Sequence, residues 1–185
     1  MTKNVLILAT DGFEQSELMK PKQNLEDAGI KTTIVSLESG SIKGWSEDDW
    51  GDSVTVDTTV SEIDDIDEYD ALLLPGGQIN PDVLRMNAEA VAIVEEFGRE
   101  DKPIAAICHA PWLLVEAGLV NGRQITGWPS IRTDLENAGA SVMDEEVVVD
   151  GNLITSRKPD DIPAFSKALI EKLGETAEKR ELESA

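Results

Sequence analysis

The chain has 185 residues, of which 37 are acidic and 16 are lysine or arginine, so its formal net charge is −21. Such a surface repels phosphate groups, which excludes nucleic acids and anionic membranes as expected partners. No apolar run approaches the length of a membrane span, and the N-terminus shows no signal-peptide pattern, so we expect a cytoplasmic protein.

The first half of the chain alternates between strand and helix patterns. Residues 4–9 are apolar and predict a strand, and residues 14–28 predict an amphipathic helix with a kink or a restart at Pro21. Residues 31–36 are rich in β-branched side chains and predict a second strand. Residues 40–56 then predict a hairpin excursion with tryptophans at its turn.

The second half continues this alternation. A buried strand at residues 71–75 ends in two glycines, a helical segment follows at 81–98, and another buried strand covers 104–107. The shorter elements expected after it are a helix at 111–117, a strand at 124–127, a helix at 130–138, a hairpin at 146–155 that turns at Asp150 and Gly151, and a last helix at 161–173.

Strands that alternate with helices are typical of a mainly parallel sheet covered by helices on both faces. We therefore predict an α/β fold built as a three-layer sandwich. The length suits one domain with a sizeable core, and no linker or repeat divides it. We assign residues 1–173 to this single domain and residues 174–185 to a charged C-terminal tail that frays.

The only cysteine, Cys108, is followed directly by the only histidine, His109. The pair lies between the predicted strand at 104–107 and a predicted helix, with small residues on either side at Ala106 and Ala110. A strained strand-to-helix turn that accepts only small neighbours and exposes a nucleophile is called a nucleophile elbow. The pattern predicts such an elbow with Cys108 as its nucleophile.

The expected surroundings of Cys108 favour a reactive thiol. Free N–H groups and the dipole at the start of the following helix favour the thiolate, and backbone N–H groups can hold an oxyanion. A single cysteine cannot form an intramolecular disulfide, so the thiol stays free. The alternative is a buried, inert cysteine that packs as a small hydrophobe. The small flanking residues favour the nucleophile.

Two other segments follow buried strands and join Cys108 as candidates. Sites in open α/β sheets form at the carboxyl ends of the strands. Glu14, after the first strand, could exchange a proton with the thiol, although an acid in the first turn of a helix also favours the helix dipole. Gly76 and Gly77 could bring backbone N–H groups to an oxyanion, or they could form a simple turn.

The sequence predicts neither a metal nor an organic cofactor. The acidic residues are scattered over presumed helix faces and loops, which indicates a solvated surface. A zinc site cannot be built from the usual ligands without a second histidine or cysteine, and the spacing of an EF-hand is absent.

Several motifs together resemble the PfpI family of intracellular proteases and deglycases. The resemblance covers nearly the whole chain up to about Leu173, with its motifs in the expected order. This family belongs to the class I glutamine amidotransferase-like superfamily, with the Parkinson-disease-associated deglycase protein, which implies a flavodoxin-like sandwich. The motifs are Gly12-Phe13-Glu14-x-x-Glu17, Leu73-Leu74-Pro75-Gly76-Gly77, Ala105 to Trp112, Ala117 to Arg123, Asp134 to Gly139 and Val147 to Asn152.

The resemblance implies a role for each matching residue. Cys108 would be the nucleophile, Glu14 would hydrogen-bond its sulfur, and His109 would be the base of a dyad. The backbone N–H of Gly77, in the loop that also contains Gly76, and the backbone N–H of His109 would hold the oxyanion. Adjacent residues form a dyad only if the imidazole turns back, because the side chain after an elbow nucleophile usually points away. We therefore expect Cys108 and Glu14 to carry more of the chemistry than His109.

Two positions depart from the family pattern. In protease-like members an acid from a neighbouring subunit completes a triad, and its match here is Asp82, where better-known members have glutamate. Trp128 stands where some relatives have a tyrosine near the site and is expected to contact substrate. The resemblance also implies homo-oligomers, as dimers, trimers or hexamers. Trp45, Trp50 and Trp112 are either interface anchors or core residues.

We expect a cysteine-dependent enzyme that acts on small reactive carbonyls and converts methylglyoxal to lactate without glutathione. Such a reaction needs a reactive thiol, one acid or base and an oxyanion site. One alternative is an intracellular cysteine peptidase with a Cys-His-acid triad at a subunit interface. Another is a stress protein that senses oxidation through Cys108. The expected partners are accordingly a small carbonyl or a peptide.

The excess of acidic residues predicts adaptation to concentrated salt, where dense surface carboxylates keep a protein hydrated. We expect the free energy of unfolding to rise between dilute and molar KCl, as measured by thermal or urea unfolding. A chain that is equally stable in dilute buffer would contradict this prediction.

Overall fold

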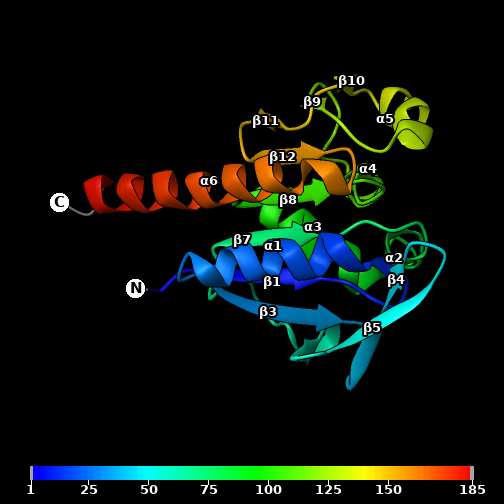
Figure 1. Cartoon of the computed structure of the whole chain (residues 1–185). Helices are drawn as coiled ribbons and strands as arrows, with labels where there is room; N and C mark the ends of the chain where they lie inside the picture. The colour runs from blue at the N-terminus through cyan, green and yellow to red at the C-terminus, as the bar shows by residue number, and fades with distance from the viewer. Residues whose placement is uncertain (1, 184–185) are drawn as a thin grey trace.

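A seven-stranded sheet lies at the centre of the computed structural model, which describes the backbone of residues 2–183 and the side chains of residues 2–175. The sheet strands are β1 (Asn4–Leu8), β3 (Lys31–Ser36), β6 (Thr58–Thr59), β7 (Ala71–Leu74), β8 (Ile104–Ile107), β11 (Val148–Asp150) and β12 (Leu153–Ser156). Their order is β11-β12-β8-β7-β1-β3-β6, and only the pairing of β11 with β12 is antiparallel (Figure 1).

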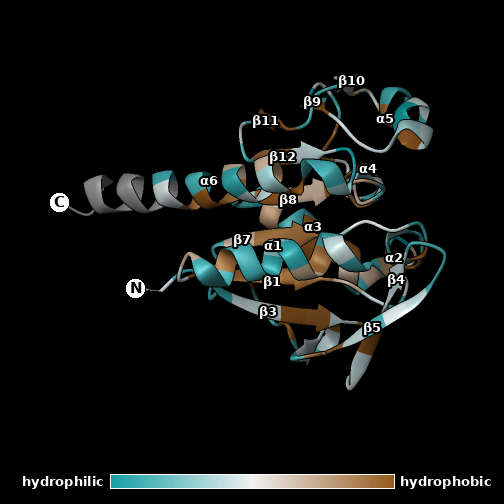
Figure 2. Cartoon of the chain, in the orientation of Figure 1, coloured by the Kyte–Doolittle hydropathy of each residue, from teal (hydrophilic) through white to brown (hydrophobic). Residues whose placement is uncertain are grey.

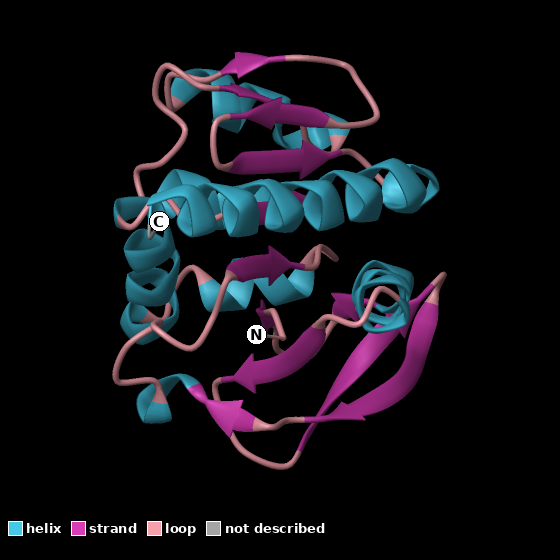
Figure 3. Ribbon diagram, turned by 90° about the vertical axis from the view of Figure 1, so that its left-hand side faces the viewer, coloured by secondary structure: helices cyan, strands magenta, loops and turns pink. Residues whose placement is uncertain are grey.

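Helices pack on both faces of this sheet (Figure 3). They are α1 (Gln15–Asp27), α2 (Ile79–Leu84), α3 (Ala88–Arg99), α4 (Pro111–Glu116), α5 (Arg132–Asn137) and α6 (Ile162–Glu183), with single 3-10 turns at Val60–Glu62, Pro129–Ile131 and Pro159–Asp161. Within the described chain, no helix is both long and apolar enough to cross a bilayer. The predicted α/β three-layer sandwich is therefore confirmed.

Alternation along the strands divides the core between the two faces. In β1, Leu6 and Leu8 pack with the cluster under α3, α4 and α5, whereas Val5 and Ile7 pack with the cluster under α1 and α6. Successive side chains of a strand point to opposite faces, so an entirely apolar strand can serve two cores. Figure 2 shows these central strands in brown, between helices whose outer faces are largely teal.

Two smaller sheets stand beside the main one. β2 (Phe13–Glu14), β4 (Ser41–Ser46) and β5 (Asp49–Thr55) form a three-stranded sheet, and β9 (Gln124–Ile125) pairs with β10 (Ser141–Val142). The predicted hairpin with tryptophans at its turn is confirmed, because Trp45 lies opposite Trp50 with ring centroids 5.4 Å apart. Trp50 is half exposed on this hairpin.

Three boundaries differ from the sequence-based prediction. α1 continues through Pro21, which is buried in it, so the helix does not restart. The segment at 81–98 is two helices, because the side chain of Asn87 accepts a hydrogen bond from the N–H of Ala90 and caps α3. α6 continues past Leu173 to Glu183, so part of the predicted tail is helical.

A buried amide joins the loops that follow β1 and β7. The side chain of Asn80 accepts from the N–H of Thr10 at 2.8 Å and donates to the carbonyl oxygens of Pro75 and Gly76 at 2.9 and 3.2 Å. Asn80 is fully buried, so no water can replace these bonds. Asn80 therefore determines how the two strand ends meet.

We expect Asn80→Ala to lower the free energy of unfolding by about 3 kcal/mol, because it leaves the buried carbonyl oxygen of Pro75 and the partly buried N–H of Thr10 unpaired and removes one of the two hydrogen bonds to the carbonyl oxygen of Gly76. Urea unfolding measures the change. The exposed Asn137 is the matched control, and Asn137→Ala should stay within about 0.5 kcal/mol of the wild type. Equal losses in the two variants would contradict this role.

Candidate active site

Cys108 sits in a strained turn between β8 and α4. Its φ is 64°, in the left-handed region that side chains rarely adopt. The turn is held because the N–H of Cys108 donates to the carbonyl oxygen of Ser156 at 3.0 Å, and its own carbonyl oxygen accepts from the N–H of Trp128 at 2.8 Å. The strained strand-to-helix turn expected from the sequence is thus present, whereas the expected exposure of the nucleophile is not, because Cys108 is buried with only 5% of its surface exposed.

Two glycines make room for the elbow. A Cβ on Gly76 would lie 2.7 Å from the Cβ of Cys108, and a Cβ on Gly77 would lie 2.5 Å from the carbonyl oxygen of Gly12. Gly77 also has a φ of +84°, which disfavours other residues. The backbone of this loop therefore approaches the sulfur more closely than any loop with side chains could.

The carboxyl group beside the sulfur belongs to Glu17 and not to Glu14. Glu17 is fully buried, its Oε2 accepts from the N–H of Gly76 at 2.9 Å, and its carboxyl group interacts with the side chain of Cys108, while its Oε1 has no hydrogen-bond partner. Glu14 caps α1, since its carboxylate accepts from the N–H of Glu17 at 2.8 Å and from the hydroxyl of Ser16. This corrects the expectation that Glu14 hydrogen-bonds the sulfur.

The reason for this correction is helical geometry. α1 begins at Gln15, so Glu14 occupies the N-cap position, whereas Glu17 lies within the first turn and is buried against the sheet. A signal was present in the sequence, because an acceptor at the N-cap bonds the N–H three residues later. An assignment of Glu14 to the cap would have left Glu17 for the sulfur.

Burial and the nearby charge of Glu14 raise the pKa of Glu17 to about 8. Glu17 is therefore mostly protonated at neutral pH and can donate a hydrogen bond to the sulfur. Burial also raises the pKa of the Cys108 thiol, and the charge of Glu17 adds to this whenever Glu17 is ionised. The backbone N–H groups of Gly77 and His109 act in the opposite direction by hydrogen-bonding the sulfur. The resting site thus holds a thiol rather than the expected free thiolate.

The imidazole of His109 turns back toward the nucleophile. Its Nδ1 lies 3.3 Å from the sulfur of Cys108, and its Nε2 lies 3.4 Å from the hydroxyl oxygen of Ser130. The ring of Trp128 stacks on it at 5.8 Å, and the ring of Trp112 lies at 5.2 Å. The expectation that this side chain points away is therefore wrong, because the two indoles hold the ring beside the sulfur. Burial lowers the pKa of His109, so the imidazole is neutral and can accept a proton.

The remaining predicted residues lie around this centre. Gly77 brings its N–H to the sulfur, whereas the N–H of Gly76 is used by Glu17. Asp82 is exposed on α2, away from the contacts that hold His109, and its role across subunits stays a prediction. Ser130 was missed in the sequence, because it follows Cys108 by 22 residues and no motif marks it.

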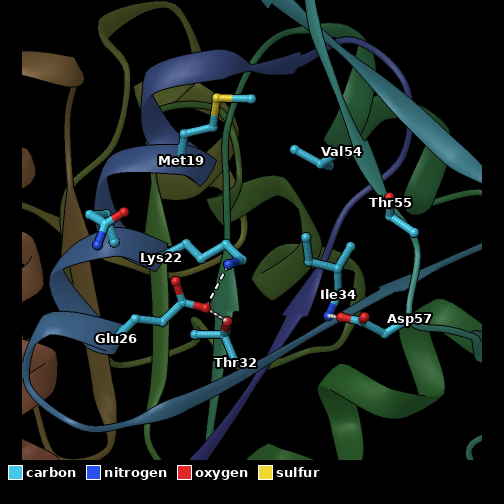
Figure 4. Close-up of a pocket in the computed structure, with 9 residues that line it drawn as sticks. Met19, Lys22, Glu26, Thr32, Ile34, Val54, Thr55 and Asp57 are labelled. Carbon is cyan, nitrogen blue, oxygen red and sulfur yellow. Dashed lines mark hydrogen bonds and ion pairs between the residues drawn. The ribbon is translucent and has the colours of Figure 1, made fainter.

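A hollow of about 580 Å³ lies elsewhere, between α1, β3 and β5 (Figure 4). Its charged groups are partnered within the protein: Lys22 and Thr32 bind Glu26, and Asp57 accepts from the N–H of Ile34. None of its lining residues belongs to the Cys108 site. Among the described residues, no group of three or more histidine, cysteine, aspartate or glutamate side chains could hold a metal ion.

Comparisons with known proteins agree with this geometry. The model of the DJ-1/PfpI family matches residues 3–172. The chain is 43% identical over 169 residues to the deglycase TK1284 of Thermococcus kodakarensis, covering 91% of this chain and 98% of that protein. It is 41% identical over 176 residues to protein/nucleic acid deglycase 2 of Escherichia coli, covering 94% and 99%. The crystal structure of DJ-1beta from Drosophila melanogaster is similar with a TM-score of 0.83 and 30% identity, over 97% of each chain.

The raised pKa of Glu17 predicts a stability that depends on pH. An ordinary glutamate titrates near 4.5 and Glu17 near 8, so between these values the folded state holds a proton that the unfolded state has lost. The contribution of Glu17 to the free energy of unfolding is complete below pH 4.5 and falls by roughly 1.4 kcal/mol per pH unit up to about pH 8. We expect Glu17→Gln to remove this slope in urea unfolding measured from pH 4.5 to 8.

The matched control is Glu14→Gln, which removes a carboxylate from the same turn but leaves Glu17 in place. The stability of Glu17→Gln relative to the wild type should rise across the whole pH window, whereas that of Glu14→Gln should rise only near its upper end, because loss of the Glu14 charge lowers the pKa of Glu17 while burial still keeps it above its ordinary value. A constant difference between Glu17→Gln and the wild type would show that Glu17 is ionised throughout.

Proposed function

The chain belongs to the DJ-1/PfpI family, and on that premise we propose that it is a deglycase-type enzyme that uses Cys108 to convert small dicarbonyls such as methylglyoxal to hydroxy acids. One observation carries this proposal. The thiol of Cys108 lies beside the buried carboxyl group of Glu17 and the backbone N–H groups of Gly77 and His109, at the carboxyl ends of the central strands, and the raised pKa of Glu17 keeps that carboxyl group mostly protonated at neutral pH. An acid and an oxyanion site beside a thiol are what carbonyl addition needs.

The first step is addition to the aldehyde. The thiol proton passes to Nδ1 of His109, which is neutral and lies 3.3 Å from the sulfur. The sulfur bonds to the aldehyde carbon, and the electron pair of the carbonyl bond moves to its oxygen. The N–H groups of Gly77 and His109 stabilise the alkoxide, and Glu17 supplies the proton that completes the hemithioacetal.

The second step is an internal oxidation and reduction that needs no cofactor. The carboxylate left on Glu17 takes the proton from the carbon bound to sulfur, which gives an enediolate. Glu17 returns this proton to the neighbouring carbon, and the hydroxyl proton of the first carbon moves to the oxygen of the second. The first carbon is thereby oxidised to a thioester and the second is reduced to an alcohol. Water then cleaves the thioester, which releases lactate and returns the thiol.

The burial of the nucleophile favours a small substrate over a polypeptide. Cys108 is only 5% exposed, and the rings of Trp128 and Trp112 stand at its histidine. A small dicarbonyl can reach such a sulfur as a free molecule. Peptide hydrolysis would also require a groove for the chain and a proton for the leaving amine.

We expect lactate to form from methylglyoxal without glutathione, in molar KCl, with kcat/KM reduced below detection in Cys108→Ala. Glu17→Gln should lower kcat by about 10²- to 10⁴-fold, because it keeps the shape of the carboxyl group but cannot transfer a proton. Glu14→Gln should stay within about tenfold of the wild type, since it weakens a helix cap and removes only the smaller of the two causes that raise the pKa of Glu17. An enzymatic lactate assay measures all four proteins.

Four outcomes would contradict the proposal. If Cys108→Ala forms lactate as fast as the wild type, the thiol is not the nucleophile. Equal losses of kcat in Glu14→Gln and Glu17→Gln would exclude a special role for Glu17. If the wild type forms no lactate but cleaves peptides in a Cys108-dependent manner, the peptidase is the correct assignment. Selective oxidation of Cys108 by mild peroxide, without turnover of either substrate, would instead favour the sensor.

A further inference from the structure

The imidazole of His109 has a polar neighbour on each side of its ring. Nδ1 faces the sulfur of Cys108 at 3.3 Å, and Nε2 faces the hydroxyl oxygen of Ser130 at 3.4 Å. His109 is buried, whereas Ser130 is exposed. The hydroxyl of Ser130 is therefore placed between the far nitrogen of the imidazole and the solvent.

The position of Ser130 is tied to the nucleophile through the backbone. The N–H of Trp128 donates to the carbonyl oxygen of Cys108 at 2.8 Å, which joins this segment to the elbow. The 3-10 turn Pro129–Ile131 follows at once, and its end is anchored by Ile131, which is fully buried. Because the ring of Pro129 also restricts its own φ, this turn holds Ser130 rigidly relative to the sulfur.

The protonation of an imidazole is decided by the partner of each nitrogen. To take a proton from the thiol, Nδ1 must be free of hydrogen, so the hydrogen of the neutral ring must sit on Nε2. A hydroxyl oxygen can accept that Nε2–H bond, and it accepts it more strongly once the ring becomes an imidazolium. A neighbour that accepts at Nε2 thus favours the form of His109 that acts as a base.

We propose that Ser130 is the positioning residue of the Cys108–His109 dyad, accepting a hydrogen bond from Nε2 so that the unprotonated Nδ1 faces the thiol. This inference rests on the proposed function, because it names the group that orients its base. It places the group that orients the dyad in the same chain. The expected acid of a neighbouring subunit, Asp82, is then not needed to orient His109.

The charged and titratable groups around His109 leave this position to a neutral hydroxyl. Glu17 from α1 lies on the sulfur side. Asp134 from α5 accepts from the indole nitrogen of Trp112 at 2.9 Å, and Arg85 from the end of α2 lies over the ring of Trp112 and pairs with Glu116 of α4. These three charged groups act on Trp112 or on each other, whereas the hydrogen-bond partner of Nε2 is Ser130.

The test uses the fact that the chain has one histidine and one cysteine. Side-chain ¹⁵N NMR of His109 reports its tautomer and titration, and the rate of iodoacetamide alkylation against pH reports Cys108; neither readout requires carbonyl turnover. In Ser130→Ala we expect an altered chemical shift at Nε2, titration of His109 at lower pH, and alkylation of Cys108 about two- to tenfold slower near neutral pH. This factor corresponds to the loss of one ordinary hydrogen bond. Ser130→Thr, which keeps the hydroxyl, should restore all three. Ser39→Ala, at an exposed serine between β3 and β4, is the matched control and should match the wild type.

Ser130→Ala with wild-type NMR shifts and alkylation would overturn the inference, and so would Ser130→Thr that fails as Ser130→Ala does. The inclusion of Asp82→Asn identifies the alternative: if this variant shifts the His109 titration and Ser130→Ala does not, a neighbouring subunit orients the ring. If the wild type forms no lactate but Ser130→Ala changes the His109 shifts and the Cys108 alkylation rate as expected, the result would contradict the proposed function and leave the role of Ser130 intact.

Discussion

The buried contact between the carboxyl group of Glu17 and the sulfur of Cys108 is the constraint on which the rest of the site depends. It brings together the start of α1, the loop after β7 and the elbow after β8, three segments far apart in the chain. A charged carboxylate in this position would be costly, so burial raises the pKa of Glu17 to about 8 and the group stays mostly protonated at neutral pH. The protonated acid beside the thiol thus arises mainly from burial, with the nearby charge of Glu14 adding to it.

The surrounding framework accepts local strain to maintain this contact. Cys108 adopts a left-handed backbone, and the loop after β7 needs glycine at Gly76 and Gly77 because a Cβ would clash at either position. Strain of this kind persists only where neighbouring structure over-determines it. Here the parallel strands supply that structure, through the bond from the N–H of Cys108 to Ser156 and through the buried amide of Asn80.

The two partners of the thiol differ in how firmly they are held. Glu17 belongs to a helix packed on the sheet, whereas His109 is fixed by aromatic rings and by the short turn that contains Ser130. Catalytic groups set on rigid elements keep their geometry with less reorganisation during reaction. The adjacency of Cys108 and His109 in sequence is useful only because Trp128 and Trp112 hold the ring back toward the sulfur.

The sequence alone determined the sandwich and the strand-to-helix turn at Cys108, because strand periodicity and small flanking residues act locally. It left Gly76 and Gly77 open between an oxyanion loop and a simple turn. The restart expected at Pro21 does not occur, because a helix packed on the sheet tolerates a proline where its packing outweighs one lost backbone hydrogen bond. The tertiary structure decided between Glu14 and Glu17: the N-cap spacing was a signal in the sequence, but both are acids near the start of one helix, and their burial shows which one faces the sulfur. It also revealed Ser130, because a contact with a residue 21 positions earlier in the chain leaves no local pattern.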